Sequence, residues 1–175
     1  MQELELGILD WIQAHLRCGL LDAALPLISR TCDHGEVWIL LAAVLLLMKR
    51  QRRYGAALTG GLLLDVVSCN VILKPLVGRL RPFAVRGVEL LVEAPLDASF
   101  PSGHTAVSFA AVFALKTAGS PLWKPALAAA LVMAFSRLYL YVHWPSDVLA
   151  GALLGAAVGW AGAKVTAALG QRKEK

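Results

Sequence analysis

The sequence is poor in charge and in cysteine. Charged residues make up 17% of its 175 positions, whereas an average soluble domain carries about 25%. So few charged residues cannot readily form the polar, solvent-exposed surface of a soluble protein. Hydrophobic residues make up 58%, and this share excludes an intrinsically disordered chain. The three cysteines (Cys18, Cys32 and Cys69) are an odd set without metal-type spacing, so the sequence implies no disulfide framework.

The net charge of +5 does not indicate a nucleic-acid-binding protein. Lysine and arginine occur in short clusters between long apolar runs, rather than along one polar face. The length suits one domain, which we expect to cover residues 1–175. The N-terminus lacks a basic region and carries acidic residues early, unlike a secretory signal.

Residues 2–16 have the periodicity of an amphipathic helix. Leu4, Ile8 and Ile12 recur at helical spacing, with acidic residues between them. We expect this helix to lie at a membrane surface. The alternative is a helix that packs within the domain.

Six apolar segments follow, and they predict an all-α, polytopic membrane bundle. They cover residues 19–32, 35–49, 54–78, 102–118, 121–142 and 146–168. Some are shorter than the roughly 20 residues that cross a bilayer squarely, and the first contains Asp22, Pro26 and Arg30. Their number, with so few charges between them, favours the membrane.

The basic clusters predict the orientation. With six spans, three clusters fall on one side, which the positive-inside rule assigns to the cytoplasm together with both termini. These clusters are Lys49 with Arg50, Arg52 and Arg53; Lys116 with Lys124; and Arg172 with Lys173 and Lys175. The outer side also carries cations, which need a separate explanation. The longest loop, 83–100, is either a lid or substrate rim, or a plain connector with a short helix.

Three polar patches interrupt the apolar pattern, and the proposed topology places them at one end of the bundle. Ionisable groups at membrane depth are costly and usually mark a functional site. The patches are Lys74 to Pro82, Pro101 to His104, and Ser136 to Asp147.

Each patch suggests a chemistry. Ser102 and Gly103 at a predicted helix start favour an anion, because free N–H groups and the helix dipole point toward it. Lys74, Arg81 and Arg137 are three cations that could surround one phosphate. Together with Ser102 and Gly103, they are the predicted phosphate-binding residues. His143 precedes Pro145, the expected first residue of the last helix, and Asp147 lies in the first turn of that helix.

These positions predict a pair in which Asp147 orients His143, leaving the other ring nitrogen free to attack. His104, from another helix, would then protonate the leaving oxygen. The catalytic residues are therefore predicted to be His143, His104 and Asp147.

The three patches resemble the signature of the type 2 phosphatidic acid phosphatase (PAP2) superfamily, which also contains vanadium haloperoxidases. The family pattern Lys-x6-Arg-Pro, Pro-Ser-Gly-His and Ser-Arg-x5-His-x3-Asp is matched without departure within residues 74–147. The resemblance implies that His143 becomes a phosphohistidine and that no metal or other cofactor is needed. Arg79 is not a motif position. It is either a contact behind the catalytic residues, a headgroup contact or an interface anchor, and we favour the interface anchor.

The expected function is that of a small bacterial integral-membrane lipid phosphatase in the plasma membrane, with its active site facing outward. Undecaprenyl diphosphate is the preferred substrate, since an outward site suits carrier-lipid recycling. The alternatives are a phosphatidylglycerol phosphate or phosphatidic acid phosphatase, or a non-catalytic lipid-phosphate binder or transporter. The membrane spans disfavour a haloperoxidase.

Two further features stay open at this level. Asp65, in the middle of a predicted span, is either a relay group or an interhelical polar contact, for example to Lys164. Four glycines in the last segment have the small-xxx-small spacing of close helix packing, either within the chain or in a homodimer. They are Gly151, Gly155, Gly159 and Gly162.

Overall fold

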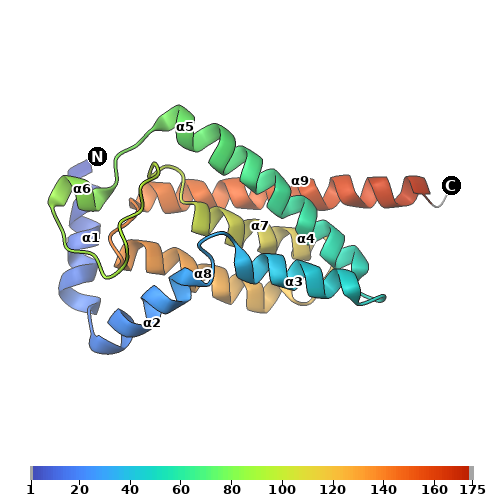
Figure 1. Cartoon of the computed structure of the whole chain (residues 1–175), viewed down its shortest axis with the longest axis horizontal. Coiled ribbons are helices and arrows are strands. Elements are labelled where there is room, and N and C mark those ends of the chain that lie inside the picture. Colours follow the sequence, from blue (N-terminus) through green and yellow to red (C-terminus); the bar gives the residue numbers. More distant parts are fainter. Residues whose placement is uncertain (1, 174–175) are drawn as a thin grey trace.

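The computed structural model describes residues 2–173, and all regular elements in that range are helical, as predicted. The elements are α1 (Gln2–Leu16), α2 (Gly19–Arg30), α3 (Glu36–Leu47), α4 (Arg52–Asp65), the π-helix η1 (Val66–Leu73), α5 (Lys74–Val77), α6 (Pro82–Arg86), α7 (Gly103–Thr117), α8 (Trp123–Tyr139) and α9 (Pro145–Lys173). Helices α3, α7, α8 and α9 run along a similar direction, α4 and α5 cross them obliquely, and α1 lies across one end (Figure 1). We call the end where α1 lies the N-terminal end of the bundle, and the end where α9 finishes the C-terminal end.

Helix α1 has the predicted bounds and packs through one face. Leu6 and Leu9 are buried in a cluster with Trp144, and Ile12 is buried in a neighbouring cluster with Tyr139. The opposite face exposes apolar side chains, namely those of Leu4, Ile8 and Trp11. The packing alternative therefore holds for one face, while contact of the other face with a membrane surface stays a prediction.

Helix α2 does not lead the chain to the C-terminal end of the bundle. The N–H of Cys18, just before α2, donates to the Tyr139 hydroxyl over 3.2 Å. Ser29, near the other end of α2, lines the same cavity as His143. The first predicted span thus stays near one end, and the two termini lie at opposite ends (Figure 1). The predictions of six spans and of both termini in the cytoplasm are therefore not confirmed.

Two segments are long and apolar enough to cross a membrane by length and composition. They are Arg52–Arg86, which contains α4, η1, α5 and α6, and Pro145–Gln171 within α9. Helix α3 is apolar but short. Its 12 residues span only about 18 Å, less than the roughly 30 Å hydrocarbon core.

The glycines of α9 allow this helix to approach its neighbours closely. A Cβ atom on Gly155 would overlap the carbonyl oxygen of Ala106 in α7, and one on Gly162 would overlap the backbone of Gly60 in α4. Close packing within the chain, one of the two predicted uses of this spacing, is therefore confirmed. Because the spacing is explained by packing within the chain, it is not evidence for a homodimer.

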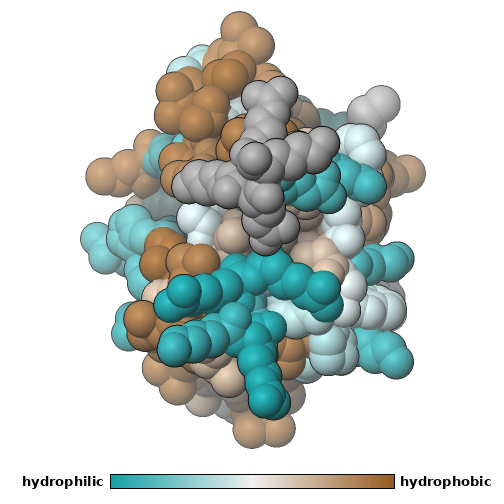
Figure 2. Space-filling view, turned by 90° about the vertical axis from the view of Figure 1, so that its right-hand side faces the viewer, coloured by the Kyte–Doolittle hydropathy of each residue, from teal (hydrophilic) through white to brown (hydrophobic). Residues whose placement is uncertain are grey.

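Many large apolar side chains remain exposed along the sides of the bundle. Leu47 is 80% exposed, Leu76 is 76% exposed and Leu153 is 65% exposed. Such an extensive apolar surface is unusual for a soluble monomer and suits contact with lipid tails. The C-terminal end instead gathers hydrophilic residues (Figure 2). The α3–α4 turn, with Lys49 and Arg50 exposed, lies at this end.

The long loop begins with the short helix α6 and then continues without regular structure to the start of α7. Its residues 92–97 line the cavity that also holds His143. The loop therefore forms a rim, which was one of the two predicted alternatives.

Candidate active site

His143 lies in the turn between α8 and α9, and an unusual backbone conformation leads into it. Tyr141 has φ of 59°, a left-handed value that is uncommon for residues other than glycine. The side chain of Tyr141 is buried, and its hydroxyl donates to Asp10 of α1 over 2.7 Å. This hydrogen bond ties the turn that presents His143 to the N-terminal helix.

The tautomer of His143 follows from its neighbour Arg81. Arg81 Nη1 lies 3.2 Å from His143 Nε2. Because a guanidinium can only donate hydrogen bonds, Nε2 must accept and the ring proton must sit on Nδ1. The Nδ1 atom lies 3.6 Å from Asp147 Oδ2, longer than a hydrogen bond, as is common before a substrate tightens a site.

The surroundings of His143 also favour its neutral form. The side chain is buried, and this burial, together with the charges of Arg81 and Arg137, lowers the pKa of His143 to about 4, although Asp147 acts in the opposite direction. The imidazole therefore keeps the Nε2 lone pair at neutral pH, as a nucleophile requires.

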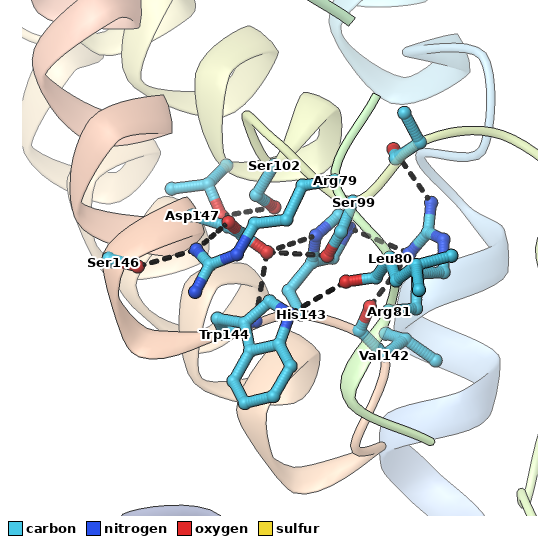
Figure 3. Close-up of polar contacts among 12 residues, drawn as sticks. Arg79, Leu80, Arg81, Ser99, Ser102, Val142, His143, Trp144, Ser146 and Asp147 are labelled. Carbon is cyan, nitrogen blue, oxygen red and sulfur yellow. Dashed lines mark hydrogen bonds and ion pairs between the residues drawn. The ribbon is translucent and has the colours of Figure 1, made fainter. Parts of the chain in front are cut away.

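Asp147 lies in the first turn of α9, as predicted, and is fully buried. Its Oδ2 atom accepts hydrogen bonds from the Ser99 hydroxyl over 2.5 Å and from the Trp144 N–H over 3.0 Å. Its Oδ1 atom accepts from Arg79 Nη1 over 2.6 Å (Figure 3). Sequence reasoning missed Ser99, which does not belong to the motif pattern. For Arg79 it favoured an interface anchor, whereas the structure shows the other alternative, a contact behind the catalytic residues.

Two of the predicted phosphate-binding cations are paired with a carboxylate from the rim loop. Lys74 forms an ion pair with Asp97, and Arg81 Nη2 lies 2.7 Å from Asp97 Oδ1. Partial burial acts to raise the pKa of Asp97, but the two cations outweigh it and lower this pKa to about 2. The Asp97 carboxylate thus occupies the place in which the predicted chemistry puts a phosphate oxygen. Nothing in the sequence pattern indicated this pairing.

Arg137, the third predicted cation, is buried with only 3% of its surface exposed. Its Nε atom has no hydrogen-bond partner among the residues that the structure describes. An unpaired buried donor is costly, and an anion in the adjoining cavity would satisfy it. Gly103 lies beside Lys74: a Cβ added to it would be in ordinary contact with Lys74 Nζ, at 3.6 Å.

His104 pairs with a carboxylate that sequence reasoning did not single out. Its Nε2 atom lies 3.1 Å from Oδ1 of Asp33, in the connection between α2 and α3. The pair repeats the histidine–aspartate arrangement of His143 and Asp147 on the other side of the site. Burial and the positive charges of Arg137 and Lys74 lower the pKa of His104 to about 2, which favours the neutral imidazole. The negative charges of Asp33 and of a bound phosphate would favour the protonated form that a general acid needs.

These groups line one cavity of about 900 Å³. Six predicted site residues contribute to its wall, namely Lys74, Arg81, Gly103, His104, Arg137 and His143. Asp147 lies behind His143 rather than in the wall. Ser102 is also outside it: its hydroxyl lies 3.0 Å from Thr105 Oγ1, and its N–H donates to the Asp147 carbonyl oxygen over 3.1 Å.

Asp65 lines the same cavity and is buried, and its Oδ1 has no hydrogen-bond partner among the described residues. The contact with Lys164 considered from the sequence is not formed, because the Lys164 side chain is exposed.

Across residues 2–173 no group of three His, Cys, Asp or Glu side chains is arranged to hold a metal ion.

The outer cations that contradicted a simple charge bias are explained by these contacts. Arg79 pairs with Glu5 and Asp147, and Arg86 pairs with Asp10 over 2.9 Å. An end of a helical bundle that combines a buried histidine–aspartate pair with clustered cations defines a phosphoryl-handling site.

The family profile of the PAP2 superfamily matches residues 36–171. This match covers most of the chain, and the chain belongs to the PAP2 superfamily. The resemblance read from the motifs is therefore confirmed, and the protein is a phosphatase of this family.

Several curated relatives have related names. An undecaprenyl-diphosphatase of Sulfolobus acidocaldarius is 41% identical over 121 residues, covering 68% of this chain but only 58% of that protein. A decaprenylphosphoryl-5-phosphoribose phosphatase of Mycobacterium tuberculosis is 34% identical over 89% of this chain and 86% of its own length. The undecaprenyl-diphosphatase BcrC of Bacillus subtilis is 31% identical over 81% of this chain and 72% of its own length.

Solved structures share the fold. Aquifex aeolicus LpxE superposes with a TM-score of 0.78 at 28% identity, covering 92% of this chain and 95% of that one. A transmembrane PAP2-type phosphatidylglycerolphosphate phosphatase from Bacillus subtilis superposes with a TM-score of 0.69 at 21% identity, over 93% of this chain and 84% of that one. The second likeness bears on the fold alone.

Proposed function

We propose that this membrane lipid phosphatase hydrolyses undecaprenyl diphosphate to undecaprenyl phosphate and inorganic phosphate through a phosphohistidine. One observation carries the proposal: the Nε2 lone pair of a buried, neutral His143 faces Arg81 at 3.2 Å, in a cavity lined by further cations. A nucleophile that meets cations in this way is suited to attack a phosphate, whose oxygens those cations hold.

In the first step, His143 Nε2 attacks the terminal phosphorus and forms an N–P bond. The P–O bond to the leaving group breaks, and the leaving oxygen takes a proton from His104. Lys74, Arg81 and Arg137 hold the phosphate oxygens, together with the backbone at Gly103, and stabilise the charge that develops on them. Asp147 stabilises the positive charge on the His143 ring.

In the second step, His104, now neutral, takes a proton from water, and the resulting hydroxide attacks phosphorus. The N–P bond breaks, inorganic phosphate leaves and His143 is restored. Because the three cations supply the electrostatic stabilisation, we expect the reaction to proceed without a metal ion.

The choice of a polyprenyl diphosphate is supported by two kinds of observation. The relatives from Sulfolobus acidocaldarius, Mycobacterium tuberculosis and Bacillus subtilis all carry polyprenyl groups in their names. The cavity of about 900 Å³ is also roomier than one phosphate needs, and exposed apolar side chains surround the bundle, where a tail could stay in the bilayer.

The orientation proposal keeps the site at the outer face of the cytoplasmic membrane. The exposed basic turn after α3 lies at the opposite end of the bundle from the cavity, as the positive-inside rule requires for a cytoplasmic loop. The end of α9 would then be cytoplasmic, and α1 would lie outside with the site.

The test is phosphate release by the purified protein in detergent with EDTA present. Undecaprenyl diphosphate, phosphatidylglycerol phosphate and phosphatidic acid are compared side by side. We expect His143→Ala to abolish release and the matched variant His15→Ala to retain it, because His15 is exposed on α1 away from the cavity.

The highest kcat/KM should belong to undecaprenyl diphosphate. Faster turnover of a phospholipid would favour the phospholipid alternatives, and turnover by His143→Ala would overturn the mechanism. Binding of all three lipids without release would point to a binder or transporter.

A further inference from the structure

Behind the proposed His143–Asp147 pair lies an arginine that the PAP2 motif pattern does not include. Arg79 Nη1 lies 2.6 Å from Asp147 Oδ1, and the Asp147 side chain has no exposed surface. The other carboxylate oxygen, Oδ2, is the one that faces His143 Nδ1. Arg79 therefore fixes the half of the carboxylate that does not touch the histidine (Figure 3).

Arg79 is itself held from several directions. Its Nη1 atom also donates to the Ser146 hydroxyl over 2.7 Å, and its guanidinium lies 4.9 Å from the ring centroid of Trp144. Its Nη2 atom lies 2.7 Å from Glu5 Oε2. A side chain with partners on each face has little rotational freedom left, unlike an arginine that merely reaches into an interface.

Glu5 brings the N-terminal helix into this network. Only 5% of the Glu5 surface is exposed, and its Oε1 atom accepts the backbone N–H of Ser146 at the start of α9 over 2.8 Å. Hydrogen bonds from Ser146 and Arg79 lower the pKa of Glu5, although its burial alone would raise it. Helix α1 lies outside residues 36–171, which the family profile matches.

We propose that Arg79 is a positioning residue for Asp147 and that Glu5 of α1 sets the position and charge of Arg79. Rotation of the Asp147 carboxylate would break the Arg79 contact, so Oδ2 stays turned toward His143. Two carboxylates and one guanidinium leave one net negative charge, so Asp147 still presents negative charge to the imidazole. The inference rests on the proposed roles of His143 and Asp147.

The test measures kcat and KM for phosphate release by four variants beside the wild type. Arg79→Gln removes the charge and the paired donors, Arg79→Lys keeps the charge alone, and Glu5→Gln keeps the shape of the acid. Arg86→Gln is the matched control, because Arg86 also pairs with α1, through Asp10, but is about half exposed and does not line the cavity.

We expect Arg79→Gln to lower kcat by about tenfold or more while KM changes by less than about twofold, since positioning acts on the transition state. Arg79→Lys should recover part of the loss, Glu5→Gln should lower kcat less than Arg79→Gln, and Arg86→Gln should match the wild type.

Two other results would overturn the inference. An unchanged kcat for Arg79→Gln would make Arg79 an interface anchor, and a raised KM with unchanged kcat would make it a headgroup contact. His143→Ala is run in parallel: if it stays active, the proposed mechanism fails as well, whereas an inactive His143→Ala with a fully active Arg79→Gln refutes the positioning role alone.

Discussion

The guanidinium of Arg81 lies between the imidazole of His143 and the carboxylate of Asp97, 3.2 Å from the first and 2.7 Å from the second. One cation therefore contacts both the proposed nucleophile and a carboxylate of the rim loop. This arrangement connects the protonation of His143 with the occupancy of the phosphate-binding cations.

The first prediction concerns pH. Since the pKa of His143 is lowered to about 4, kcat/KM should be retained at neutral pH and fall as pH drops through this value, because the protonated ring has no lone pair to attack with. Arg81 and Arg137 lower this pKa and Asp147 raises it. Arg81→Gln should therefore move the acid limb of the kcat/KM profile to higher pH.

The measurement is kcat/KM from acid to neutral pH for the wild type and Arg81→Gln, with one substrate. The substrate's own ionisation is common to both profiles and cancels in their difference. An acid limb at the same pH in both would mean that Arg81 does not control the protonation of His143.

The second prediction concerns Asp97. Its carboxylate is held by Lys74 and Arg81, so a phosphate must share or displace it. Asp97→Asn keeps the shape and removes the competing charge, and it should strengthen competitive inhibition by inorganic phosphate several-fold. Glu89→Gln is the control, because it removes a charge from an exposed position of the same loop outside the cavity wall. Weaker inhibition in Asp97→Asn would show that Asp97 instead holds the cations ready for phosphate.

The third prediction concerns the packing of α9 on α7. A Cβ at Gly155 would overlap the Ala106 carbonyl oxygen, and such overpacking costs about 1–3 kcal/mol. Gly155→Ala should therefore lower the melting temperature. It should also lower activity, because α7 carries His104 and α9 carries Asp147. Tryptophan fluorescence during heating in detergent measures the transition.

Gly170→Ala is the control for this substitution, since a Cβ there meets no atom within 4 Å. Alanine is the better helix former by about 0.5–1 kcal/mol, so this variant should be as stable as the wild type or slightly more stable. Equal melting temperatures for the wild type and Gly155→Ala would mean that the two helices can separate without cost.

The sequence by itself determined the all-α class, the bounds of α1, the start of α9 at Pro145 and the motif residues that identify the family. These depend on local order: helical periodicity, a proline at a helix start, and a histidine four residues before an aspartate. Such features can be predicted from the sequence because the interacting positions are neighbours along the chain.

Only the tertiary structure decided which polar groups meet. Arg79 is separated from Glu5 by 74 positions and from Asp147 by 68, and no periodic pattern links positions so far apart. The pairing of Asp97 with Lys74 and Arg81 depends on the path of an irregular loop. The place of α2 depends on contacts with Tyr139 rather than on its hydrophobicity. Long-range contacts and loop paths follow from the packing of the whole bundle, and for that reason the sequence alone did not predict them.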